Sequence, residues 1–154
     1  MTTSFDIIRG TPEHASTLTG ITITAKRHWG YPEKWMRLWL PQLTLSAEYI
    51  AGNEVWVAVV DDAAVAYYSL KQDEEHLWLD NLWVIPEFMG QGIGKQLFQH
   101  ALERSRARIF SILHIEADPN AQSFYEKMGA HKVGEHQHEL DGQVRALPIM
   151  EIEL

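Results

Sequence analysis

The spacing of hydrophobic and polar residues changes character near residue 54 of the chain. Before that point apolar residues recur at helical intervals, and prolines and small polar residues divide the pattern into segments. The pattern predicts a strand over 4–9, helices over 12–26 and 32–40, and a further helical turn capped by Ser46. Thr11 and Pro12 suit the start of the first helix, and Pro41 should end the second.

Beyond residue 54 the chain alternates between runs of β-branched or aromatic residues and two helical segments. We expect strands over 54–60, 64–70, 76–84, 109–117, 131–138 and 144–153, and helices over 94–106 and 118–128. Asp61-Asp62 and Asp141-Gly142 should form hairpin turns, and Gly129 should end the last helix. The order predicts a single domain over 1–154, with α and β elements around one sheet.

The amino-acid composition limits the kinds of site and the class of protein that the chain can form. The chain has 154 residues, of which 45% are hydrophobic, so one ordinary core is expected. It has no cysteine, which excludes disulfides, thiolate metal sites and a cysteine nucleophile. The start of the chain lacks a signal-peptide pattern, and no apolar run has the length of a membrane span, so we expect a cytoplasmic protein without membrane contact.

The charge balance is acidic, with 13 Lys and Arg against 21 Asp and Glu, for a formal net charge of −8. Such a surface disfavours nucleic-acid binding, which needs cations against phosphates. It weakly favours a cationic partner such as an amine.

A glycine-rich turn, Met89-Gly90-Gln91-Gly92-Ile93-Gly94-Lys95, joins a predicted strand to a predicted helix. A helix N-terminus leaves backbone N–H groups unpaired and carries partial positive charge, so such a turn can hold a phosphate or pyrophosphate. The P-loop pattern fails because Gln96 follows Lys95, and the dinucleotide pattern fails because its third glycine is missing. The alternative is a tight turn without a ligand.

The run Leu82-Trp83-Val84-Ile85-Pro86, followed by this turn and an amphipathic helix, resembles the acetyl-CoA motif of the GNAT superfamily of N-acetyltransferases. The resemblance implies a mixed, mostly antiparallel sheet of about seven strands with helices on both faces. It also implies acetyl-CoA as co-substrate and no metal. Leu82, Trp83 and Val84 would bind the pantetheine arm, and the turn, including Met89 and Gly90, would bind the pyrophosphate through amides of 91–95. Met89 departs from the Arg or Gln usual there.

A second run, Asp118-Pro119-Asn120-Ala121-Gln122-Ser123-Phe124-Tyr125-Glu126-Lys127-Met128-Gly129-Ala130, resembles the family's other cofactor motif. By resemblance Tyr125 is the general acid that protonates the departing thiolate, which a phenol with a pKa of about 10 can do. Either Asp118 or Asn120 would contact the pantetheine, with Ala121 and Phe124 beside it. The alternative is that the two aromatic residues only pack the helix against the sheet.

The sequence indicates the residues that bind and deprotonate the amine acceptor less clearly than those that bind the cofactor. An amine nucleophile needs a base, and Asp80, which interrupts an apolar strand, is the first candidate, with Glu116 as the second. A carboxylate on an exposed strand face is the alternative for Asp80. The resemblance also places His28, Trp29 and Tyr31 in the acceptor pocket, although a tryptophan is more often a core residue.

His136 and His138 share one strand face and are expected to be solvated rather than to bind metal. The predicted function is acetyl transfer from acetyl-CoA to a primary amine of a small molecule or peptide. The amine would attack directly in a ternary complex, in a monomer or a homodimer. The alternative is an acyl-CoA-binding sensor without catalysis.

Overall fold

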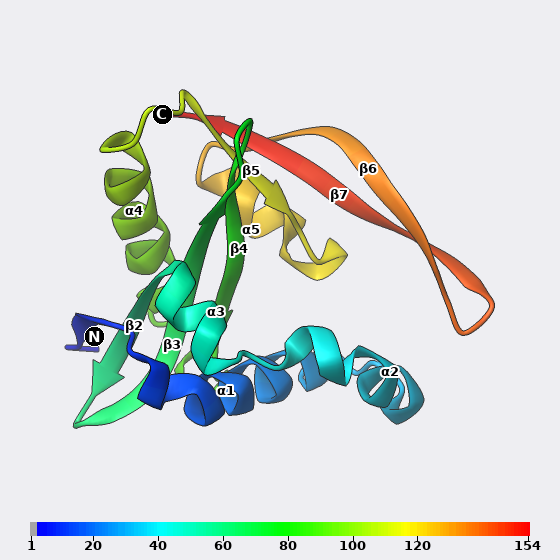
Figure 1. Ribbon diagram of the computed structural model, residues 1–154. Helices are drawn as coiled ribbons and strands as arrows, with labels where there is room; N and C mark the ends of the chain where they lie inside the picture. Colours follow the sequence, from blue (N-terminus) through cyan, green and yellow to red (C-terminus); the bar gives the residue numbers. More distant parts are fainter. Residues whose placement is uncertain (1–2) are drawn as a thin grey trace.

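The computed structural model describes residues 3–154, which build a seven-stranded sheet in the order β1-β2-β3-β4-β5-β7-β6 (Figure 1). Only β4 and β5 pair in parallel, and the other neighbours are antiparallel. The strands are β1 (Asp6–Arg9), β2 (Glu54–Val60), β3 (Ala63–Gln72), β4 (Leu77–Val84), β5 (Ile112–Glu116), β6 (His131–Leu140) and β7 (Gln143–Glu153). The expected mixed, mostly antiparallel α/β architecture is confirmed.

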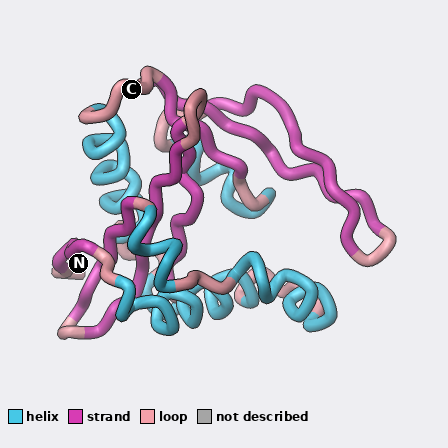
Figure 2. Tube along the Cα trace, in the orientation of Figure 1, coloured by secondary structure: helices cyan, strands magenta, loops and turns pink. Residues whose placement is uncertain are grey.

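Helices cover both faces of this sheet (Figures 1 and 2). They are α1 (Ala15–Arg27), α2 (Glu33–Leu43) and α3 (Ala47–Gly52) on one side, and α4 (Ile93–Arg106) and α5 (Gln122–Lys127) on the other, with 3-10 turns at Pro12–His14, Pro86–Phe88 and Pro119–Ala121. Successive residues of a strand point to opposite faces. Tyr67 of β3 accordingly packs in the cluster with Leu18 of α1, whereas Tyr68 packs in the cluster with Phe98 of α4. None of the helices within residues 3–154 is long and apolar enough to cross a membrane.

The local signals for turns and caps are confirmed. Asp61 and Asp62 both have positive φ angles, as do Asp141 and Gly142, which is the backbone of two-residue hairpin turns. The Ser46 side chain accepts the N–H of Tyr49 at 3.0 Å and caps α3.

Two boundary predictions are wrong. Pro41 lies inside α2 rather than ending it, because the lost hydrogen bond and the clash of its ring with the preceding turn disturb only the last turn of a helix that ends at Leu43. The fifth strand begins at Ile112 rather than Ile109, whose side chain is 96% exposed on the turn that follows α4. Apolar character alone did not distinguish that exposed isoleucine from a strand residue.

The feature that creates the site is the incomplete pairing of β4 and β5. The two strands are in register only from Leu77 to Leu79 of β4 and from Leu113 to Ile115 of β5. Beyond Leu79 they separate, so the second half of β4 presents backbone N–H and C=O groups on that side without a strand partner. These groups must be paired by a ligand or by water.

Candidate functional site

The separated ends of β4 and β5 open into a cavity of about 370 Å³. Its lining contains these predicted cofactor residues: Leu82, Trp83, Val84, Met89, Gly90, Gly92, Gly94, Lys95, Asp118, Asn120, Ala121, Phe124 and Tyr125. Asp80 and Trp29 of the predicted acceptor set also line it. Four predicted site residues, Gln91, Ile93, His28 and Tyr31, are not part of the lining. The two motifs therefore meet at one cavity although they are about thirty residues apart.

The glycine turn has the geometry of an anion site. Gly92 is the N-cap of α4 with φ 84°, and Gly90 has φ 77°. A Cβ added at either residue would have no other heavy atom within 4 Å beyond its chain neighbours, so the space beside the turn is open. The first turn of α4 contains no acidic residue, and Lys95 adds positive charge there. Glycine offers no side chain to cap the helix, which leaves the first amides free for a ligand.

Two residues of this turn, Gln91 and Ile93, do not direct their side chains into the cavity. The side chain of Ile93 is fully buried in the core, so only its backbone faces the turn. Gln91 directs its side-chain amide back to the carbonyl of Glu87 at 3.1 Å. At Gly94 an added Cβ would lie 3.6 Å from both Phe124 and Val84, an ordinary van der Waals contact, so α4 begins close against these two side chains.

Tyr125 projects from α5 into the core beside the cavity, with its ring 5.7 Å from that of Phe98 and 5.2 Å from that of Phe124. The residue is 7% exposed. Burial, and to a lesser degree the charge of Asp118, raises the pKa of Tyr125 above its usual range, so the phenol is protonated at neutral pH. No hydrogen bond within the described chain contributes to this shift. The hydroxyl is therefore available to a ligand.

Asp80 is the extra residue of a bulge in β4. Asn81 pairs with Ser69 and Leu79 with Leu70, so Asp80 has no partner in β3. Bulges redirect a side chain and are frequent beside active sites. The Asp80 carboxylate accepts a short hydrogen bond from the hydroxyl of Tyr49, and burial followed by that carboxylate raises the pKa of the phenol.

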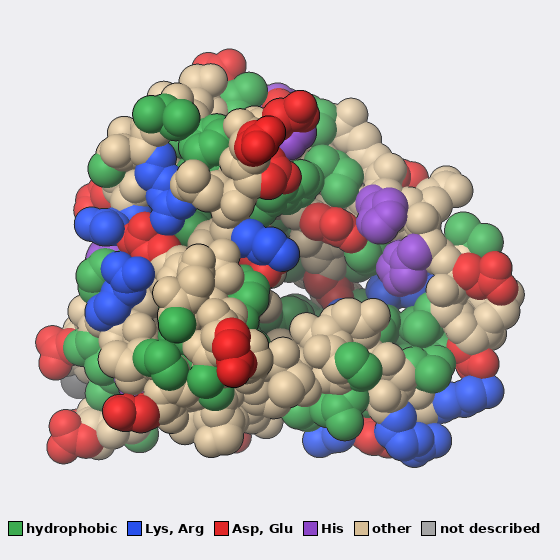
Figure 3. Space-filling view, viewed as in Figure 1, with side chains coloured by type: hydrophobic (Ala, Val, Ile, Leu, Met, Phe, Trp, Pro, Cys, Tyr) green, Lys and Arg blue, Asp and Glu red, His purple; other side chains and the backbone are tan. Residues whose placement is uncertain are grey.

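A second cavity, of about 430 Å³, meets the first at the gap between β4 and β5. Both cavities share the residues Leu79, Asp80, Trp83, Glu116 and Asp118. Figure 3 shows the molecule hollowed between helices and sheet, with acidic and histidine side chains beside the hollow. Glu116, at the end of β5, approaches Nδ1 of His136 at 3.0 Å. The two carboxylates that could act as base thus stand at the junction of the cavities.

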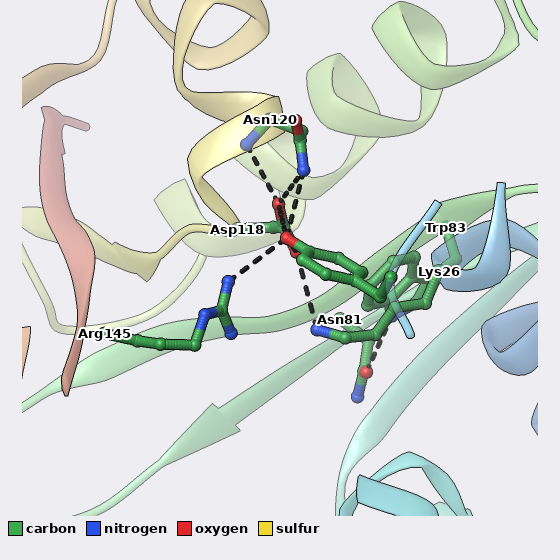
Figure 4. Close-up of polar contacts among 7 residues, drawn as sticks. Lys26, Asn81, Trp83, Asp118, Asn120 and Arg145 are labelled. Carbon is green, nitrogen blue, oxygen red and sulfur yellow. Dashed lines mark hydrogen bonds and ion pairs between the residues drawn. The ribbon is translucent and has the colours of Figure 1, made fainter. Parts of the chain in front are cut away.

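Asp118 and Asn120 differ in how many of their side-chain polar atoms already take part in hydrogen bonds. Both oxygens of Asp118 accept from Tyr31, at 2.9 and 3.0 Å, and Lys26 lies 3.4 Å away (Figure 4). The side-chain nitrogen of Asn120 donates to the Tyr31 hydroxyl and to Asp118, and its amide oxygen is not part of this network. Asn120 is the better placed of the two for a cofactor amide.

The acceptor residues predicted near the end of α1 separate into two groups. Trp29 lines the first cavity and is 41% exposed, so it is not a core tryptophan. His28 is exposed and makes an edge contact with Trp29 at 5.6 Å. Tyr31 turns away to Asp118, and burial and that carboxylate raise its pKa to about 12.

Several residues at the site carried no readable sequence signal. Asn81 accepts the indole N–H of Trp83 at 3.0 Å and so orients that ring. Lys26 lies over the ring of Trp39, at 4.0 Å from its centroid, and burial lowers its pKa while Asp118 opposes the shift. Arg145 comes from β7. Such contacts join segments far apart in the chain, which a pattern of spacing does not reveal. No group of three or more metal-ligating side chains is found within residues 3–154.

Comparison with known proteins agrees with this geometry. The sequence model described as "Acetyltransferase (GNAT) family" matches residues 21–130. The chain belongs to the GNAT family. It is 30% identical over 108 residues to the peptidyl-lysine N-acetyltransferase YjaB of Salmonella typhimurium, covering 70% of each chain. It is 28% identical over 127 residues to the uncharacterized N-acetyltransferase YafP of Escherichia coli, covering 81% of this chain and 77% of that one.

Solved GNAT structures share the fold. A GCN5-related N-acetyltransferase from Rhodopseudomonas palustris has a TM-score of 0.83 at 21% identity, covering 100% of this chain and 98% of that one. The PaiA N-acetyltransferase of Thermoplasma acidophilum, solved with coenzyme A, has a TM-score of 0.76 at 20% identity, covering 98% and 99%. The GNAT family uses acetyl-CoA, and this family membership makes the chain an acetyltransferase.

Proposed function

We propose that this GNAT protein transfers an acetyl group from acetyl-CoA to a primary amine, in a ternary complex without a covalent acyl-enzyme. The observation that carries the proposal is the meeting of two cavities at Asp80 and Glu116: the first contains an anion-binding turn and Tyr125, and the second opens beside carboxylates. A protein that only senses acyl-CoA needs the first cavity but not the second.

The first cavity suits acetyl-CoA in two respects. The amides of residues 91–95 and the positive end of α4 would hold the pyrophosphate. The unpaired edge of β4 from Leu82 to Val84 would pair with the amides of the pantetheine arm. Bound there, acetyl-CoA would supply an activated thioester carbonyl beside Tyr125.

Two side chains would move the protons. Asp80 accepts a proton from the incoming ammonium, directly or through water, so that the amine nitrogen can attack the carbonyl carbon. Tyr125 donates its phenolic proton to the sulfur as the carbon–sulfur bond breaks. The amide nitrogen then gives its remaining extra proton to the Tyr125 phenolate, directly or through water, which leaves an amide, a free thiol and a restored phenol. Asp80 releases its proton to water.

The relative from Salmonella typhimurium acts on peptidyl lysine, so lysine side chains belong among the acceptors to be tested. Purified protein with acetyl-CoA and a panel of primary amines, including a lysine peptide, should release free thiol and form acetylated amine in equal amounts. Binding of acetyl-CoA without thiol release on any amine would instead support the sensor function.

A further inference from the structure

The tip of the β6–β7 hairpin reaches across to α2 (Figures 1 and 2). Leu140 at this tip packs against the buried cluster of Met36, Trp39 and Leu43. Beside it, Lys34 and Asp141 form an exposed ion pair at 2.8 Å. The hairpin and the helix layer are therefore joined on the side of the second cavity that faces away from β3.

Arg145 forms the inner part of this junction. Its guanidinium lies 5.1 Å from the ring centroids of Tyr31 and Trp39 and 5.5 Å from that of Trp35. It also donates to the Tyr31 hydroxyl at 3.1 Å. A planar cation that stacks on aromatic rings and donates at its edge is held in direction as well as in position.

The Tyr31 hydroxyl joins this arginine to Asp118, which with Lys26 forms one wall of the second cavity. It accepts from Asn120 and Arg145 and donates to Asp118 (Figure 4). Asp118 in turn pairs with Lys26, and the two side chains are 9% and 12% exposed. Both line the second cavity, whereas Tyr31 and Arg145 stand behind them. The wall is thus a nearly buried ion pair that is braced from three segments of the chain.

We propose that Tyr31 and Arg145 form a clasp that closes the acceptor cavity on the side of α2 and thereby restricts acceptors to slender, unbranched primary amines. This inference rests on the proposed function. Asp80 and Asp118 line both cavities, so an acceptor that is bulky close to its nitrogen would press on Asp118 and Lys26 as it approaches Asp80. A nearly buried ion pair resists losing its partners. A narrow alkyl amine reaches the junction at Asp80 without moving that wall.

The test is a series of aminomethyl compounds with similar amine basicity and increasing bulk: n-butylamine, isobutylamine, cyclohexylmethylamine and 1-adamantylmethylamine. For the wild type, kcat/KM should fall at least about tenfold across the series, the discrimination that a modest steric difference gives. Tyr31→Phe keeps the ring and removes the hydroxyl, and Arg145→Met keeps the length and removes the charge. Each should reduce the discrimination ratio severalfold.

Lys34→Ala is the matched control, because it removes an exposed link between the same two elements without touching the clasp. It should keep the wild-type ratio. The ratio separates the clasp from a purely structural role, since partial unfolding lowers the rate for every amine alike. A wild type that does not discriminate, or clasp variants whose ratio is unchanged, would overturn the clasp and leave the acetyltransferase intact. Absence of turnover on all four amines and on lysine peptides would overturn the proposed function and this inference with it.

Discussion

Replacing Tyr125 with phenylalanine separates catalysis from packing at the centre of the site. The ring contacts with Phe98 and Phe124 remain, and no hydrogen bond within the described chain contributes to the hydroxyl's raised pKa. Stability should therefore change little. If the hydroxyl donates the proton to sulfur, the rate should fall by about 10²- to 10⁴-fold, which raises the barrier by about 3 to 5 kcal/mol.

The control is Tyr68→Phe on β3, where another buried tyrosine does have a hydrogen-bond partner. Its hydroxyl lies 2.6 Å from Nδ1 of His100 and outside both cavities. Losing that bond should cost about 1 kcal/mol of stability and leave the rate normal. Tyr125→Phe should thus lower the rate without changing thermal stability, and Tyr68→Phe should lower thermal stability without changing the rate.

Thiol release at saturating acetyl-CoA gives kcat, and calorimetry gives the acetyl-CoA affinity, which should be unchanged in Tyr125→Phe. The rate loss should shrink with an acyl donor whose leaving group is better than the coenzyme A thiolate, because such a group needs less protonation. Unaltered turnover of Tyr125→Phe, under conditions where chemistry limits the rate, would refute the acid role and leave the residue a packing element.

Three further outcomes follow from other residues. Gly92→Val should cost about 1–2 kcal/mol, because φ is 84°, and should abolish acetyl-CoA binding measured by calorimetry, whereas Gly20→Ala on α1 should leave binding intact. Asp80→Asn should lower kcat by about 10²-fold or more at unchanged acetyl-CoA affinity, and normal turnover would exclude Asp80 as the base. Burial favours the neutral carboxyl of Glu54, but hydrogen bonds from one tryptophan and two arginines outweigh it and lower its pKa to about 2. Its stabilisation is complete above about pH 4.5 and is lost as the pH falls towards 2, so Glu54→Gln should flatten that part of the stability curve in thermal denaturation.

Local chemistry made much of the fold predictable. Glycine at positive φ, a serine cap and paired turn residues act within a few positions, so their signals survive in the sequence alone. The glycine turn before α4 is predicted for the same reason, since the groups proposed to bind the pyrophosphate are backbone amides. Prediction failed at Pro41 because the residue stands too near the end of α2 to break it. It failed at Ile109 because apolar character does not show that the residue lies exposed on a turn.

The acceptor side resisted prediction because its contacts are long-range. Tyr31 meets Asp118 across 87 positions and Arg145 across 114. Nothing in the spacing of residues near Tyr31 indicates that its hydroxyl joins three segments. The bulge that turns Asp80 towards the cavities likewise depends on how β4 registers with β3, which hydrophobic alternation does not fix.

The tyrosines around the junction also bear on which hydroxyl can act as the acid. Tyr31 and Tyr49 each donate to a carboxylate, and in both cases burial and that carboxylate raise the pKa of the phenol. Their protons are committed to Asp118 and Asp80, and moving either proton to sulfur would leave that carboxylate without its phenol donor. Tyr125 is protonated for the same reason, burial, but its proton is not committed to a carboxylate within the described residues. Of the three phenols, Tyr125 can therefore release its proton to a thiolate at the least cost to the surrounding hydrogen bonds.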